Sequence, residues 1–99
     1  MEFQSYNNTE RIYKKVLSIE ENGTLIAPIH SKVIKVGEQD DYLVAWFKFE
    51  TRLCDDAAPI SYKIVGTGDD YDVDDDFRYF DTVIMSNGLV WHVFFKKDD

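Results

Sequence analysis

Cysteine is almost absent from this chain of 99 residues, which contains Cys54 alone. A single thiol excludes an internal disulfide and a metal site built only of cysteines. Proline is nearly as scarce, since only Pro28 and Pro59 interrupt the chain. No proline-rich or glycine/serine-rich linker divides the sequence. A chain of this length holds one hydrophobic core, so we predict a single domain over residues 1–99.

Long apolar segments are also missing. No run approaches the roughly 20 apolar residues that span a bilayer, and the chain does not open with a signal-peptide pattern. We therefore expect no membrane partner.

The ends are rich in polar and charged residues, and we expect residues 1–10 and 96–99 to be flexible.

Positive charge is the third shortage. Eleven Lys and Arg residues face nineteen Asp and Glu residues, which gives a net charge of −8 at pH 7. Because proteins that bind the nucleic-acid backbone need an excess of positive charge, we expect no direct nucleic-acid partner. The imbalance is uneven: residues 1–50 hold eight acids and six bases, and residues 51–99 hold eleven acids and five bases. The densest run is Asp69–Asp76, with six aspartates in eight residues and no base.

Apolar material is plentiful by contrast, with 44% hydrophobic and 15% aromatic residues. It alternates with a period of two, which is typical of β-strands. The pattern is clearest at residues 42–49 and 89–96. Weaker strands are predicted at residues 11–19, 24–27, 32–36, 60–65 and 79–85. We therefore predict an all-β domain, a small antiparallel sandwich or barrel of about seven short strands with at most one short helix. Trp46 and Trp91 should lie in or near its core.

Turn signals separate the predicted strands. Asn and Gly tolerate positive φ, so Glu21–Gly23 and Ser86–Gly88 are predicted hairpin turns. Gly37–Asp41 is a third turn region. A short helical turn would fit either residues 55–59 or residues 72–78.

Five short stretches then occur in a fixed order. They are Ile12-Tyr13-Lys14, Pro28 with residues 32–36, Val44-Ala45-Trp46, Ile64-Val65-Gly66-Thr67-Gly68 and Val90-Trp91-His92-Val93-Phe94. In this order they resemble an uncharacterised family of small domains of tailed phages and prophages. The resemblance covers about residues 11–95. It implies a phage origin and an all-β domain, and it implies no activity. Together with the lack of a signal-peptide pattern and of a membrane-spanning run, a phage origin leads us to expect a location in the host cytoplasm.

No combination of residues predicts catalysis. His92 lies between apolar residues, which favours a partly buried, hydrogen-bonded histidine over a general base. Cys54 stands beside two aspartates rather than the cations that activate a thiol. The aspartates of Asp70–Asp74 have the spacing of a calcium loop, but Asp75 occupies the position where an EF-hand requires glycine. We therefore expect no enzyme activity, no catalytic residue, no cofactor and no metal site.

The aspartate-rich run leads to the main functional prediction. Carboxylates spaced along a β-rich surface can imitate the phosphates of a nucleic acid and occupy the Lys/Arg groove of another protein. We expect a non-enzymatic phage protein that binds and blocks a host defence or nucleic-acid-handling protein with a basic surface. The residues predicted to contact this partner are Asp69, Asp70, Asp72, Asp74, Asp75 and Asp76.

Two other functions stay open. The loop Gly66-Thr67-Gly68 could offer backbone N–H groups to a phosphate, so that oligomers of the protein would bind a nucleotide immune signal and withhold it. A minor virion or assembly protein is the other alternative. The simplest interpretations are a glycine turn at a strand end and an acidic loop that keeps the protein soluble.

Overall fold

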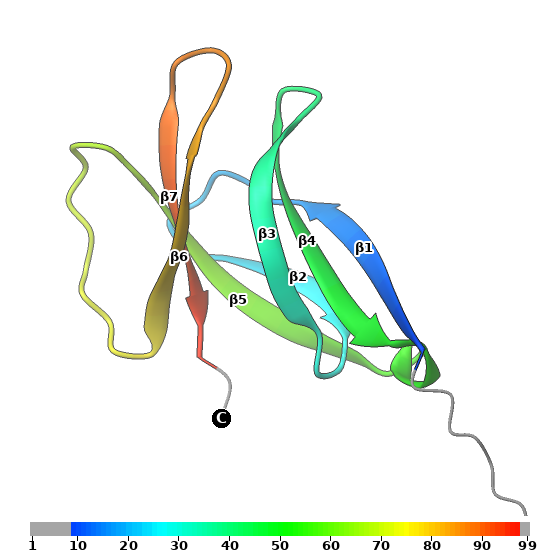
Figure 1. Ribbon diagram of the computed structural model, residues 1–99. Coiled ribbons are helices and arrows are strands. Elements are labelled where there is room, and N and C mark those ends of the chain that lie inside the picture. The colour runs from blue at the N-terminus through cyan, green and yellow to red at the C-terminus, as the bar shows by residue number, and fades with distance from the viewer. Residues whose placement is uncertain (1–8, 98–99) are drawn as a thin grey trace, which may run out of the picture.

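The computed structural model describes residues 9–97, which form seven strands and one short 3-10 helix (Figure 1). The elements in chain order are β1 (Glu10–Val16), β2 (Gly23–Pro28), β3 (Lys32–Gln39), β4 (Tyr42–Glu50), η1 (Thr51–Leu53), β5 (Ala57–Gly66), β6 (Phe77–Ile84) and β7 (Val90–Lys96). The predicted all-β class, with about seven strands and one short helix, is confirmed.

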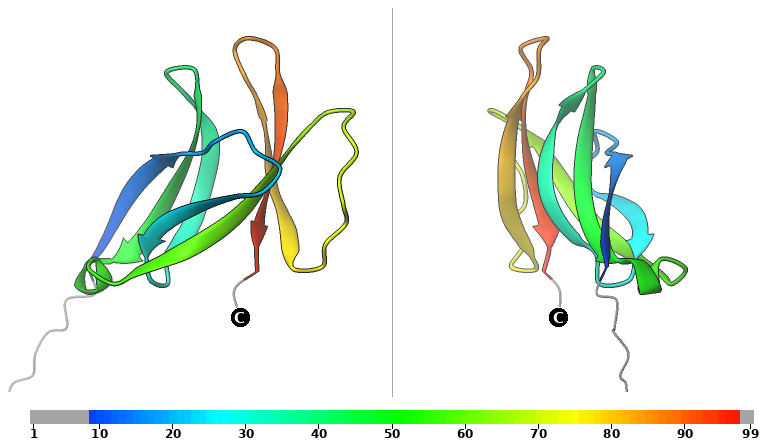
Figure 2. Two further views of the ribbon diagram at one scale, coloured as in Figure 1. Left: turned by 180° about the vertical axis from the view of Figure 1, so that it is seen from behind. Right: turned by 45° about the vertical axis from the view of Figure 1, so that its right-hand side comes forward.

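The strands form two antiparallel sheets. One has the order β1-β4-β3, and the other has the order β2-β5-β7-β6. The sheets face each other, with β3 and β4 on one side of the space and β6 and β7 on the other (Figure 2). The fold is therefore a sandwich rather than a barrel, and the strongly patterned segment 42–49 became the central strand of its sheet.

The core lies between the sheets and uses inward-facing residues of every strand except β1, whose residues are all exposed. From β4, Phe47 and Phe49 are almost fully buried, and from β7, Val93 is fully buried. Trp91 packs against this cluster as predicted. The prediction was wrong for Trp46, which is only half-buried and lies outside the cluster, because the residues on either side of it already occupy the core side of the pleat.

The hairpin predicted at Glu21–Gly23 does not form. β1 and β2 belong to different sheets, so this segment crosses from one sheet to the other. Gly23 serves a different purpose from the one expected, since a Cβ atom there would collide with the ring of Tyr62. The hydroxyl of Tyr62 in turn accepts a hydrogen bond from the backbone N–H of Ser18, at 3.0 Å. Glycine is therefore required at position 23 because the Tyr62 ring comes so close to the backbone, and not because the chain turns there.

The other turns agree better with the sequence. Ser86–Gly88 joins the paired strands β6 and β7, and Gly88 has a φ of +92°. The turn between β3 and β4 is shorter than predicted, because only Asp40 and Asp41 take positive φ, while Gly37 stays within β3. The short helix falls at residues 51–53, outside both expected positions.

The predicted flexible ends lie largely outside the described residues, which exclude 1–8 and 98–99. Of the residues of these ends that are described, Glu10 begins β1 and Lys96 ends β7. Within residues 9–97, no helix is long and apolar enough to cross a membrane.

Candidate functional site

A long loop, residues 67–76, connects β5 to β6 and contains the predicted partner-binding aspartates. All six aspartates are exposed. The loop lies on the side of β6 and β7 that faces away from the three-stranded sheet (Figures 1 and 2). Tight turns close both of its ends, since Asp69 N–H donates to the Gly66 carbonyl at 3.1 Å and Phe77 N–H donates to the Asp74 carbonyl at 3.0 Å. The fold thus presents the aspartates together on one exposed loop.

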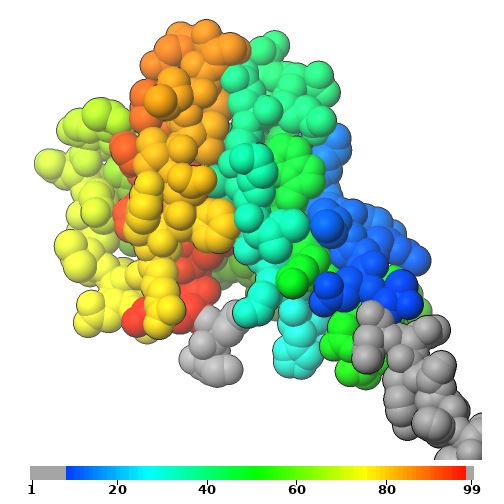
Figure 3. Space-filling view, in the orientation of Figure 1, coloured from blue at the N-terminus to red at the C-terminus, as the bar shows by residue number. Residues whose placement is uncertain are grey.

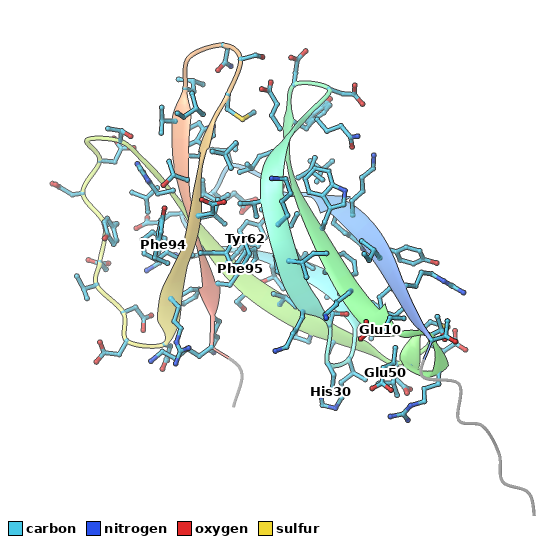
Figure 4. All side chains as sticks on the ribbon, viewed as in Figure 1. Glu10, His30, Glu50, Tyr62, Phe94 and Phe95 are labelled. Atoms are coloured by element: carbon cyan, nitrogen blue, oxygen red, sulfur yellow. The ribbon has the colours of Figure 1, made fainter. Side chains whose placement is uncertain are left out.

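The loop packs against the outer face of the four-stranded sheet. Lys63 of β5 and Phe94 of β7 are cross-strand partners on this face, and the ring of Tyr71 from the loop lies 5.3 Å from that of Phe94. Figure 4 shows Phe94 on the loop side of the sheet, whereas Tyr62 and Phe95 lie toward the three-stranded sheet. Both sets of alternate apolar residues in this sheet are therefore covered: one set packs in the core, and the other packs beneath the loop.

Lys63 fixes the loop to the sheet. Its side chain is only 5% exposed. The ammonium donates a hydrogen bond to the backbone carbonyl of Asp72 at 3.1 Å and lies 5.0 Å from the centre of the Phe77 ring. This cation thus contacts both the middle of the aspartate run and the residue that follows it. Sequence reasoning did not single out Lys63, because one lysine in a strand usually faces water.

Replacing Lys63 with methionine should release the loop while preserving the buried volume. A hydrogen bond from a charged donor contributes about 1.5–3 kcal/mol, so amide hydrogen exchange across residues 69–77 should accelerate by about tenfold or more. Lys32→Met, at an exposed position of β3, is the matched control and should leave those rates unchanged. Equal exchange in the loop for the Lys63 variant and the parent would show that Lys63 does not hold it.

A pocket of about 310 Å³ opens between the loop and the sheet. It is lined by Val65, Gly66, Thr67, Gly68, Asp69, Tyr71, Tyr79, His92 and Phe94, and we call it the aromatic pocket. Phe94 stands between two tyrosines, with ring centroids 5.3 Å from Tyr71 and 5.7 Å from Tyr79. In the space-filling view, atoms of β7 are visible between the loop and β6 (Figure 3).

His92 belongs to this pocket and is held by hydrogen bonds on both sides. Its Nε2 lies 2.8 Å from the hydroxyl of Thr67, and its Nδ1 lies 2.9 Å from the hydroxyl of Thr82. The Thr82 hydroxyl also lies 2.6 Å from that of Tyr79. The predicted partly buried, hydrogen-bonded histidine is confirmed, and its bonds connect the start of the loop to β6. Neither ring nitrogen is left to take a ligand.

A second hollow, of about 460 Å³, adjoins the first and is strongly acidic. We call it the acidic hollow. Glu20 and Glu21, from the connection between β1 and β2, line it together with Asp69 and Asp70, and none of the described Lys, Arg or His residues lines it. Sequence reasoning missed the two glutamates. They are an adjacent acidic pair, but nothing in the sequence shows that a crossing between sheets brings them beside a loop almost fifty residues away.

The glycine loop predicted as an alternative phosphate site lies in the wall of the aromatic pocket. A carboxylate oxygen of Asp69 would be 2.8 Å from a Cβ atom placed on Gly66. The carboxylate therefore lies close to the Gly66 backbone, and a phosphate that approached there would be repelled by a like charge. The hydroxyl of Thr67 is engaged with His92. Gly68 stands open: its φ is +91°, and a Cβ atom added there would meet no atom within 4 Å.

The remaining candidates lie apart. Cys54 is exposed, next to η1, at the opposite end of the molecule from the loop (Figure 1). Within residues 9–97, no three His, Cys, Asp or Glu side chains are grouped so as to hold a metal ion. The two ion pairs found in that range, Lys48–Glu10 and Arg52–Glu50, do not involve the loop.

These features define a small two-sheet β protein with an acidic, partly aromatic candidate binding surface. The chain belongs to the family described as a domain of unknown function (DUF7352), whose model matches residues 8–99. No curated protein and no solved structure matches the chain. The predicted membership of an uncharacterised domain family is thereby confirmed, while the phage origin stays a prediction.

Proposed function

We propose that this protein is a non-enzymatic, phage-encoded binding protein that blocks a basic host protein of defence or nucleic-acid handling. The observation that supports the proposal is the meeting of two acidic segments. Glu20 and Glu21 lie beside Asp69 and Asp70 around one hollow, and the other aspartates of the loop extend this surface. The acidic surface is thus larger than the loop alone.

Gathered carboxylates create a field that reaches beyond contact distance. Like charges around a concave surface raise the local concentration of cations and accelerate the approach of a positively charged partner. They also repel one another, and Lys or Arg residues of a partner would relieve that repulsion. A protein groove that normally holds nucleic-acid phosphates has the matching charge. The proposed partner is therefore a nucleic-acid-binding surface, approached by charge mimicry.

A nucleotide sponge is the second candidate, and the existence of a pocket at Gly66–Gly68 is the observation in its favour. The position of the Asp69 carboxylate over Gly66 weighs against it, because a phosphate would meet a negative charge. We therefore rank it below partner binding.

The proposal is tested by capture from host lysate, followed by affinity measurement with the purified partner. The test variant removes four charges from the loop: Asp72→Asn, Asp74→Asn, Asp75→Asn and Asp76→Asn. These side chains are exposed, so the core should survive. Affinity at low salt should fall by about tenfold or more, mainly through slower association.

The control removes the same amount of charge elsewhere, by Asp40→Asn, Asp41→Asn, Asp55→Asn and Asp56→Asn. All four positions are exposed, and asparagine tolerates the positive φ of Asp40 and Asp41. This variant should lose much less affinity than the loop variant. Equal losses would indicate only a net-charge effect, and unchanged inhibition by the loop variant would leave the loop as a solvated surface.

A further inference from the structure

We propose that the aromatic pocket binds a cationic side chain of the partner, with arginine as the preferred residue. The inference rests on the proposed function and names the chemistry of its central contact. The acidic surface would guide the partner, and the pocket would hold one of its side chains.

Three aromatic rings make the pocket suitable for a cation. Phe94 is inclined at 48° to Tyr71 and at 74° to Tyr79, so the rings stand at angles around the space rather than stacking on one another. The face of an aromatic ring attracts a cation within about 6 Å of its centroid. A volume of about 310 Å³ lies at the lower end of the roughly 300–1,000 Å³ usual for ligand pockets. It therefore suits one long side chain better than a nucleotide.

The charges around the pocket select the sign of the ligand. Asp69 lines both the aromatic pocket and the acidic hollow, and within residues 9–97 no Lys or Arg residue lines either of them. A guanidinium resting on the rings could donate hydrogen bonds to the Asp69 carboxylate in the fork geometry that arginine favours. The same carboxylate would repel a phosphate. The aromatic rings and the carboxylate of the pocket thus both favour a cationic ligand.

The protein already holds a cation in this manner on the same face of the sheet. Lys63 lies over the ring of Phe77 and donates to a loop carbonyl, although it is almost fully buried. Lys63 does not line the aromatic pocket, so this cation leaves the space free for another. The loop and the sheet therefore surround the Lys63 ammonium with an aromatic ring and an oxygen acceptor. The aromatic pocket offers the same two kinds of group, its rings and the Asp69 carboxylate, to a cation of the partner.

The test uses three short peptides with the parent protein. The probes are acetyl-Gly-Arg-Gly-amide, its lysine analogue and its citrulline analogue, which keeps the shape of arginine without the charge. Nuclear magnetic resonance titration should show shifts at Gly66, Tyr71, His92 and Phe94 with arginine, smaller shifts with lysine and none with citrulline. Inorganic phosphate and AMP, titrated in the same way, should leave these signals unchanged.

Two variants separate the rings from the charge. Phe94→Leu keeps an apolar side chain but removes the central ring, and it should weaken arginine binding by about fivefold without altering its salt dependence. Asp69→Asn should weaken binding and flatten the salt dependence. Ile84→Leu, at a position of β6 that is 74% exposed, should change neither. Asp69→Asn keeps the test decisive if the Phe94 variant does not fold.

The inference is overturned if citrulline binds as well as arginine, or if phosphate or AMP moves the pocket signals and arginine does not. It is also overturned if both variants bind arginine as the parent does. Any of these results would leave the proposed function standing, because that function is tested separately by the partner affinity of the loop variant with four Asp→Asn changes.

Discussion

Replacing Phe47 with alanine should cost about 3–5 kcal/mol of unfolding free energy, the usual range for removing a large aromatic side chain from a packed core. Phe47 is 0% exposed, and its ring centroid lies 6.2 Å from that of Phe49. It belongs to the central strand of its sheet, so the cavity would open between the two sheets. Because a small domain has about 5–15 kcal/mol of stability in all, the variant should be close to unfolded. Urea denaturation followed by far-ultraviolet circular dichroism measures the loss.

Two comparisons make this result specific. Val73→Ala, at a loop position that is 88% exposed, should change the unfolding free energy by less than about 0.5 kcal/mol. Trp91→Ala should cost less than Phe47→Ala, since Trp91 is half-buried at the edge of the core and lines the acidic hollow. A loss below about 1 kcal/mol for Phe47→Ala would mean that the two sheets do not pack as described.

Neutralising the acidic hollow should have the largest effect on partner binding. The variant combines Glu20→Gln, Glu21→Gln, Asp69→Asn and Asp70→Asn. Among the described residues, these four are the charged residues that line the hollow, and like charges along a concave surface reinforce one another's field. Electrostatic steering typically changes association rates by about 10–1,000-fold, so association at low salt should slow by about tenfold or more. Stopped-flow fluorescence with the purified partner measures this rate.

The control is the variant described above with Asp→Asn changes at Asp40, Asp41, Asp55 and Asp56. It has the same net charge as the variant of the acidic hollow. It should associate nearly as fast as the parent. A variant with only Glu20→Gln and Glu21→Gln should already slow association. If that pair has no effect, the glutamates are bystanders and the binding surface is restricted to the loop predicted from the sequence.

The strands could be predicted because the sheets bury alternate residues. In the sequence of residues 42–49 and 89–96, apolar residues recur at every second position, and the strands β4 and β7 that these segments form occupy inner positions in their sheets. The hairpin at Ser86–Gly88 was predictable because glycine supplies the positive φ found at Gly88. Glu21–Gly23 has a similar local sequence but serves a different structure, because the partner of β1 is the distant β4. A local turn motif does not determine which distant strands will pair.

The candidate site could be predicted only where it is local in sequence. The aspartate run and the glycine loop were both visible as motifs, and the half-buried state of His92 followed from its apolar neighbours. Lys63 and the pair Glu20 and Glu21 could not be found in the same way. Their roles depend on the path by which the loop folds back over the sheet and on the crossing between sheets, which are tertiary features.

The central claim is that a basic partner is guided to an acidic surface, and the salt dependence of association by the unaltered protein tests it most directly. Between about 0.01 M and 1 M salt, the screening length falls from about 30 Å to about 3 Å. The association rate constant with the purified partner should fall steeply over this range, while the dissociation rate changes little. An association rate constant that stays level from low to high salt would contradict the account.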